Sequence, residues 1–171
     1  MRFLTNGSHR DNGKGLLQLS LGISLAFTVF FWATNVLLFV EKMGFSYQSI
    51  VEYYLGNEEK FKTPVSYMGL LETTHSHIFA FAMLLLFLNH LIIFVDITRS
   101  MKIILILGSS LSALGDILSG WFIVYVSPVF AFLKISSFVV LQLSISLLLV
   151  FILKSIFIVS DKRETPSDTE T

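Results

Sequence analysis

The sequence predicts an all-α protein, a four-transmembrane-helix bundle without a soluble domain. Of its 171 residues, 54% are hydrophobic and 17 are phenylalanine. Four long apolar stretches divide the chain, and each provides the roughly 20 residues that a helix needs to cross a bilayer. Short polar segments separate the stretches. A polytopic membrane protein accounts for this pattern, with expected spans at about 16–40, 70–96, 102–125 and 129–158.

The first span follows a polar segment, residues 1–14, which is expected to be a cytoplasmic tail. Basic residues ahead of an apolar run also occur in signal peptides. Here the run from Leu16 to Val40 is too long for the apolar region of a signal peptide, and no small-residue cleavage site closes it. The expected membrane domain is therefore 15–158.

The 41–69 segment is the only sizeable loop between the expected spans. Ser46 suits a helix N-cap and Gly56 suits a helix C-terminus, so a short helix is expected between them. Pro64 is expected to open the second long helix, ahead of its membrane span, because a proline in the first turn lacks only an N–H that would have no partner there. The closing segment, 159–171, is polar and is expected to be a disordered tail.

Small residues are concentrated in the third span, where they predict close packing between helices. They are Gly108, Ser109, Ser110, Ser112, Ala113, Gly115, Ser119 and Gly120. Trp121 and Tyr125 suit a membrane–water interface at the far end of the same span.

Composition and motifs exclude several classes of function. The chain has no cysteine, which rules out disulfides, thiolate catalysis and iron–sulfur clusters. Its formal net charge is +0, which gives no argument for binding nucleic acid. Neither a phosphate-binding loop, nor a nucleotide fingerprint, nor a nucleophile–base motif is present. The sequence therefore favours a membrane protein that is not an enzyme.

The distribution of basic residues predicts the orientation in the membrane. Cytoplasmic loops are rich in Lys and Arg. Eight basic residues lie on one side of the expected spans: Arg2, Arg10, Lys14, Arg99, Lys102, Lys154, Lys162 and Arg163. Three lie on the other side: Lys42, Lys60 and Lys62. Both termini are therefore expected in the cytoplasm, with the 41–69 loop outside.

Asp116 and Lys134 lie well inside the expected spans, away from their ends, and their depths match. Asp116 lies about nine residues from the outer end of the third span, and Lys134 lies about five residues into the fourth, so the helical rise places both in the outer half of the bilayer. A tight turn makes these spans antiparallel neighbours. Because an unpaired charge at this depth costs several kcal/mol, Asp116 and Lys134 are expected to form a buried ion pair. Such a pair either fixes the packing of the helices or belongs to a proton or ligand site.

Three of the four histidines lie in the second expected span. At about 100° per residue, four polar side chains share one stripe about 100° wide on this helix: Glu72, His75, Asn89 and His90. Since lipid cannot satisfy polar groups, this stripe is expected to face the interior of the bundle. His77 lies on the opposite side of the helix.

Ligand binding by these histidines has two forms. His75 and His90 are about 22 Å apart along the helix, which suits one haem b near each leaflet. No other span holds a histidine, so the second axial ligand would come from Met or from a homodimer partner, and His77 would act only across such an interface. Alternatively, Glu72 and His75 have the i, i+3 spacing of carboxylate-bridged metal sites, which Asp116 could complete. The third interpretation is structural or proton-handling histidines.

A set of motifs resembles a family of small bacterial four-span membrane proteins that has no assigned activity. The set comprises Tyr-Tyr-Leu-Gly-Asn-Glu-Glu-Lys at 53–60, a Thr-His-x-His-x-Phe pattern at 74–79, His90, Gly115-Asp116, and Phe-Ala-x-Leu-Lys at 130–134. The resemblance covers about residues 45–157. It implies a bundle in the bacterial cytoplasmic (inner) membrane, and it singles out His75, His77, His90, Asp116 and Lys134.

Two functions follow from these residues. The first is a haem- or metal-binding membrane protein for electron transfer, which acts as a homodimer or as a subunit of a respiratory complex. The second is a non-catalytic membrane protein whose buried His, Asp and Lys side chains serve packing or proton passage. Both have the lipid bilayer as their surroundings, and neither involves nucleic acid.

Overall fold

The computed structural model describes the backbone of residues 7–164 and the side chains of residues 15–156. Within this part the elements are, in order, α1 (Gly7–Lys42), α2 (Tyr47–Leu55), the 3-10 helix η1 (Glu58–Lys60), α3 (Tyr67–Ile92), α4 (Arg99–Tyr125), the 3-10 helix η2 (Pro128–Phe130) and α5 (Ala131–Glu164). Four of the helices, α1, α3, α4 and α5, are long and apolar enough to cross a membrane. The predicted all-α, four-span class is therefore confirmed.

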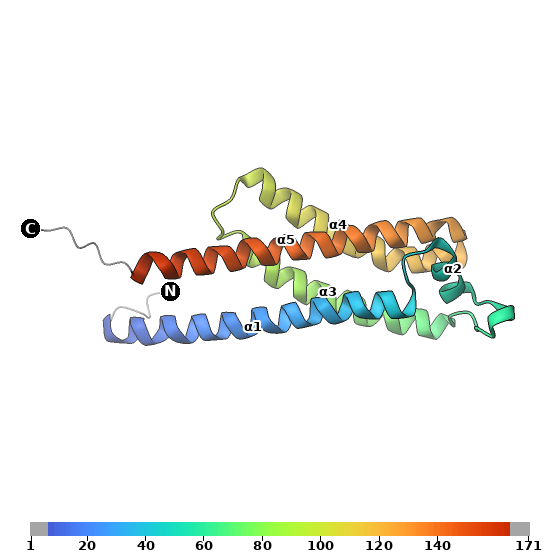
Figure 1. Cartoon of the computed structure of the whole chain (residues 1–171), viewed down its shortest axis with the longest axis horizontal. Helices are drawn as coiled ribbons and strands as arrows, with labels where there is room; N and C mark the ends of the chain where they lie inside the picture. Colours follow the sequence, from blue (N-terminus) through green and yellow to red (C-terminus); the bar gives the residue numbers. More distant parts are fainter. Residues whose placement is uncertain (1–6, 165–171) are drawn as a thin grey trace, which may run out of the picture.

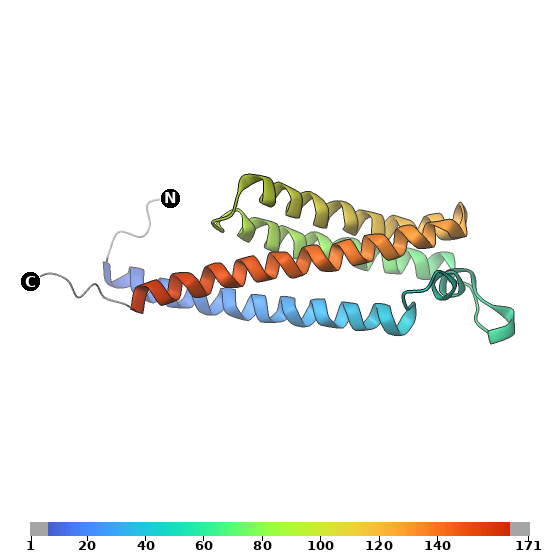
Figure 2. The ribbon, with the colours of Figure 1, turned by 45° about the horizontal axis from the view of Figure 1, so that its top comes forward.

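The four long helices lie roughly along one direction (Figures 1 and 2). The most extensive contact joins α4 to α5, and α3 packs against both. Helices α1 and α5 run past the α3–α4 turn, so that the described ends of the chain lie at one end of the bundle. We call this the terminus end. Helix α2 lies at the opposite end, which we call the α2 end.

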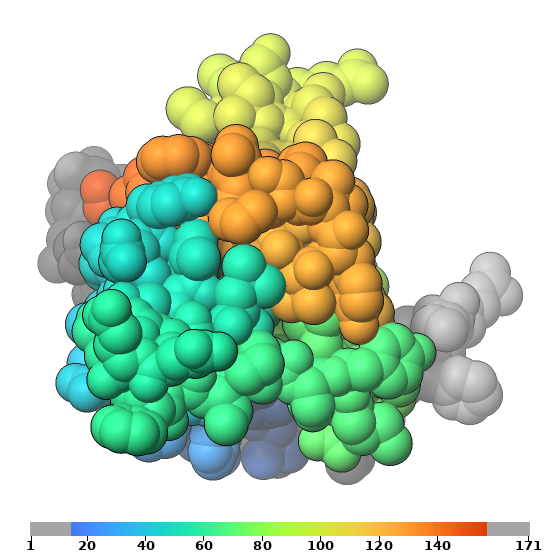
Figure 3. Space-filling model, turned by 90° about the vertical axis from the view of Figure 1, so that its right-hand side faces the viewer, coloured from blue at the N-terminus to red at the C-terminus, as the bar shows by residue number. Residues whose placement is uncertain are grey.

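The α2 end is covered by the segment between α1 and α3, which lies beside the α4–α5 turn in Figure 3. As predicted, Ser46 caps α2: its hydroxyl accepts a hydrogen bond from the Ser49 N–H at 3.0 Å. Gly56 ends α2 with φ +80°, and a Cβ at this position would lie 2.7 Å from the Lys62 carbonyl oxygen. Only glycine fits both this conformation and this close approach.

Three boundaries differ from those expected. Helix α1 begins at Gly7, inside the segment 1–14 that was expected to be a tail. Helix α3 begins after Ser66, whose hydroxyl accepts from the Gly69 N–H at 3.1 Å, so that Pro64 lies ahead of the helix instead of in its first turn. Helix α5 continues to Glu164, and the rest of the expected tail, residues 165–171, lies outside the described residues.

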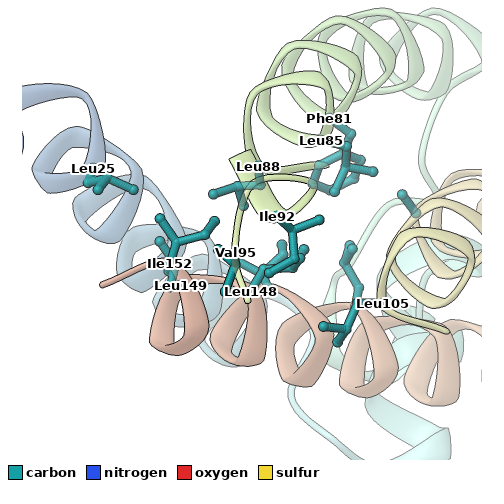
Figure 4. Packing of buried hydrophobic residues seen from close by; sticks show 13 residues of the cluster. Leu25, Phe81, Leu85, Leu88, Ile92, Val95, Leu105, Leu148, Leu149 and Ile152 are labelled. Atoms are coloured by element: carbon teal, nitrogen blue, oxygen red, sulfur yellow. The ribbon is translucent and has the colours of Figure 1, made fainter. Parts of the chain in front are cut away.

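Two groups of buried apolar side chains fill the bundle. The terminus-end cluster joins the second half of α3, the first half of α4 and the second half of α5, and Figure 4 shows its side chains converging. Its most buried members include Leu88, Ile92 and Leu148. The α2-end cluster packs α2 against the other helices through Ile50, Tyr54 and their neighbours. Helix α1 contributes little to either, because most of its apolar side chains are exposed, as expected for contact with lipid.

The small residues of α4 permit the close approach of α5, as predicted. A Cβ at Gly115 would lie 2.5 Å from the Ser137 hydroxyl oxygen, and a Cβ at Gly108 would lie 3.5 Å from that of Ser144. At Gly115 even an alanine would force Ser137 to move, so the backbone of α4 is held tightly against α5 beside Asp116.

Candidate functional site

A cavity of about 250 Å³ lies beneath α2 at the α2 end of the bundle. All five helices contribute to its wall. The polar side chains that line it include Asn35, Lys42, Tyr53, Tyr54, Thr73, Thr74, Ser76, His77, Asp116 and Lys134. A polar cavity of this size has room for several water molecules. It brings together one histidine, one carboxylate, two lysines and two tyrosines.

Asp116 and Lys134 form an ion pair at the wall of this cavity. The Lys134 Nζ lies 2.9 Å from the Asp116 Oδ1, and both side chains are almost fully buried. The ammonium donates a hydrogen bond to the backbone carbonyl oxygen of Asp116, also at 2.9 Å. The Asp116 Oδ1 receives no hydrogen bond of good geometry from a described residue. Its contact with the Lys134 ammonium is therefore electrostatic. Both residues contribute to the lining of the cavity.

His77 lines the same cavity and is half-buried. Its Nδ1 lies 2.8 Å from the Thr73 carbonyl oxygen. Since a carbonyl oxygen can only accept, Nδ1 must carry the proton in this contact, and in the neutral ring Nε2 is then the basic nitrogen. The ring packs edge-on against Phe81 at 5.5 Å between centroids, which fixes its orientation.

Tyr54 closes the cavity from the side of α2. Only 4% of the residue is exposed. Its ring packs against α4 at Gly120, where a Cβ would lie 3.1 Å from the Tyr54 Oη. Burial raises the pKa of the Tyr54 hydroxyl, and the charge of Asp116 raises it further. The hydroxyl therefore stays protonated at every physiological pH and can serve as a hydrogen-bond donor.

A second ion-pair network holds the loop that follows α2. The Glu52 carboxylate accepts hydrogen bonds from the Lys60 Nζ at 2.7 and 2.9 Å and from the Asn57 side-chain amide at 3.0 Å. Lys62 lies 3.6 Å from the same carboxylate. The hydrogen bonds from Lys60 lower the pKa of Glu52 most strongly, while its burial acts in the opposite direction. This network explains the Gly-Asn-Glu-Glu-Lys segment as a folded loop that keeps α2 in place over the cavity.

The stripe that was expected to face the interior lies instead on the outside of α3. Glu72, His75 and His90 are exposed, and Asn89 is half-buried. The buried side of α3 carries Leu70, Phe81, Leu85, Leu88 and Ile92, next to His77. The prediction was wrong because these polar residues lie near the two ends of the helix, where interfacial water can satisfy them. The large apolar side chains then determine which side packs.

This rotation separates the residues that were considered for a cofactor. Asp116 is buried beside Lys134, whereas Glu72 and His75 are exposed, so the expected set Glu72, His75 and Asp116 does not come together. Among the described residues, no three His, Asp or Glu side chains are arranged to hold a metal ion. His75 and His90 also face away from the bundle, so a haem between them and another helix of the same chain does not fit this packing.

The contribution of α2 was the part of the site that sequence reasoning missed. A short helix was expected between Ser46 and Gly56, but nothing in its sequence indicated that Tyr54 would reach Gly120. Trp121 likewise was expected only at an interface. Its indole N–H also donates to the Thr74 hydroxyl at 2.8 Å and ties α4 to α3 beside the cavity.

The model of the Aq_1264_TM family, described as a transmembrane helical domain, matches residues 44–165. The chain belongs to this family. The match begins just ahead of α2 and includes α3, α4 and α5, so it contains every residue of the Asp116–Lys134 pair, His77 and the Glu52 network. Neither the curated proteins nor the solved structures contain a match to this chain.

Breaking the buried pair should destabilise the bundle more than removing it. We expect Asp116→Leu or Lys134→Met alone to lower the stability by about 3–5 kcal/mol, because each leaves an uncompensated buried charge. The double variant should recover much of this loss. Thermal unfolding of the four proteins in one detergent measures the coupling, and two additive single effects would contradict a direct interaction.

The loop network should respond to acid. Because the pKa of Glu52 is lowered in the folded protein, its stabilising effect is complete above the usual value of 4.5 and disappears as the pH falls through the lowered value. Amide exchange in the 56–65 loop, corrected for intrinsic rates, should show loss of protection over this acidic range. Glu52→Gln should show reduced protection already at neutral pH. Glu59→Gln, a change at an exposed acid, is the matched control.

Proposed function

We propose that this chain is a non-catalytic membrane protein that exchanges protons with the extracytoplasmic side at a buried Asp116–Lys134–His77 site. The observation that carries the proposal is that the ion pair and His77 line one polar cavity beneath α2. An ion pair that served packing alone would need no adjacent space for water. This cavity supplies the contact that proton exchange requires.

The proton would move between cavity water and two groups of the chain. The Nε2 of His77 can accept a proton because Nδ1–H is committed to Thr73. The Asp116 carboxylate can accept one as well, which converts the pair into a neutral acid beside the Lys134 ammonium. The ammonium keeps its hydrogen bond to the Asp116 carbonyl oxygen but loses its counter-charge, so the protonated form of the pair is the less stable one.

The terminus half of the bundle argues for exchange at one side instead of passage across the membrane. Below the cavity lies the apolar terminus-end cluster, which includes Leu85, Leu88 and Leu148 (Figure 4). The buried hydroxyls of Ser109 and Ser112 donate to carbonyl oxygens of their own helix, so they are not free to relay protons. We therefore favour a one-sided, proton-responsive site.

The orientation is part of the proposal: the α2 end faces the extracytoplasmic side of a bacterial cytoplasmic membrane, and both termini face the cytoplasm. Eight basic residues on the terminus side of the expected spans against three on the other side support this. Tyr and Trp side chains suit membrane–water interfaces, and at the α2 end Trp121 packs against Tyr67 and stacks on Tyr125.

Reporter fusions test this orientation. At Asn57, a reporter enzyme that is active only outside the cytoplasm should be active. At the C-terminus, a reporter that is active only in the cytoplasm should be active. The same side for both, or the reverse assignment, would contradict the proposed topology.

Infrared difference spectra test the proton site. When the pH outside reconstituted vesicles is changed, the purified protein should show the carbonyl stretch of a protonated carboxylic acid, and Asp116→Asn should remove it. Asp96→Asn, at the exposed α3–α4 turn, is the control and should leave the band unchanged. If no band depends on Asp116, the proposal is wrong. A proton flux across the vesicle membrane that depends on Asp116 would show instead that protons pass through the bundle.

Haem or metal binding for electron transfer is the second candidate, and it now requires another subunit. His75 and His90 are exposed, so they could bind haem only if a second copy of the chain or a respiratory subunit supplied the other axial ligand. A Soret band or bound metal in the same purified sample, lost in His75→Ala or His90→Ala, would identify this function. His77→Ala should leave that signal in place, because His77 faces the cavity.

A further inference from the structure

A groove separate from the polar cavity runs along the outer side of α3 and α4. Its volume is about 570 Å³. Buried apolar side chains, among them Phe81, Leu85 and Ala113, form its floor, and exposed ones such as Leu86 and Leu114 form its rim. The groove therefore opens toward lipid. Known ligand sites have this size and character: mostly apolar walls with a few placed polar groups.

Three polar side chains line this groove: Asn89, His90 and Ser110. Among the described residues, none of the three has a hydrogen-bond partner, and the Asn89 Oδ1 is buried without one. Ser110 differs in this from the neighbouring Ser109 and Ser112, whose hydroxyls bond back to their own helix. Interfacial water can satisfy the exposed His90, but it does not reach the buried Asn89 Oδ1, and the Ser110 hydroxyl lies farther from the helix ends, where an unsatisfied polar group is costly.

The depth of these groups restricts what can satisfy them. Ser110 lies 11 residues into α4, or about 16 Å from its start, which places it near the middle of a span of 27 residues. Asn89 and His90 lie near the end of α3, closer to the interface. Acyl chains reach the middle of a bilayer but carry no polar atoms there. Phospholipid esters and phosphates have polar atoms but remain near the surface.

We propose that this groove binds a lipid-soluble quinone. A quinone ring lies within the hydrocarbon region and carries carbonyl oxygens on opposite edges. One oxygen can accept from the Ser110 hydroxyl. The other can accept from the Asn89 side-chain amide in the quinone form or, as the hydroxyl of the quinol form, donate to the buried Asn89 Oδ1. The apolar floor accommodates the flat ring, and the opening toward lipid leaves room for the isoprenoid tail. Binding alone is proposed, without a redox step.

Photolabelling tests the site directly. The purified full-length protein, in nanodiscs of defined phospholipid, is irradiated with a photoreactive azido-quinone, and the labelled peptides are mapped. We expect label on the 78–93 and 106–117 segments, removed by an excess of decylubiquinone. Added phosphatidylglycerol should not compete. Label spread over all lipid-facing helices, or equal competition by phospholipid, would overturn the proposal.

Variants then separate specific binding from partition into lipid. The double variant Asn89→Leu/Ser110→Ala should weaken decylubiquinone binding by roughly tenfold or more, because two hydrogen bonds are lost. Ala82→Trp should block the groove without touching these groups. Val140→Trp, at a lipid-exposed position on α5 outside the groove, is the matched control and should bind as wild type. Unchanged binding in both groove variants, which keep the helices apolar, would refute the assignment.

Discussion

The close packing of α4 on α5 is the constraint on which the candidate site depends. Gly115 has no side chain, so α5 approaches until Ser137 occupies the space where a Cβ would be. The next residue on α4 is Asp116, and one turn before Ser137 on α5 is Lys134. The close contact of the backbones therefore lets a short carboxylate and a long ammonium meet at 2.9 Å inside the bundle. Larger residues at this crossing would separate the two charges and leave each of them buried alone.

The sequence contains enough information to predict this pair but not the cavity beside it. The depth of Asp116 and Lys134 follows from the helical rise and the tight α4–α5 turn, which are local quantities. The cavity requires α2 to fold back over the bundle, and this depends on Gly56, on the Glu52–Lys60 ion pair and on the contact of Tyr54 with Gly120. Such contacts join segments that are distant along the chain, and no periodicity in the sequence reports them.

The rotation of α3 shows a second limit of sequence reasoning. Polar periodicity indicated an inward stripe through His75 and His90, yet the helix presents His77 to the interior instead. In a soluble protein, polar and apolar sides of a helix identify the core. In a membrane span both sides are largely apolar, so a few polar residues near the ends say little about orientation. The bulk of Phe81, Leu85, Leu88 and Ile92 decides it here.

Helix α4 connects the two places where polar groups gather. Ile117 follows Asp116 directly and contributes to both the cavity and the lipid-facing groove. Its side chain is therefore part of the partition between a compartment that holds charge and one that is almost wholly apolar. Ile117 is apolar, so an apolar side chain separates the charged groups that line the cavity from the groove, although Asp116 and Ile117 are neighbours on the same helix. The close approach of α4 to α5 at Gly115 fixes where Asp116 and Ile117 lie, and it therefore positions both linings.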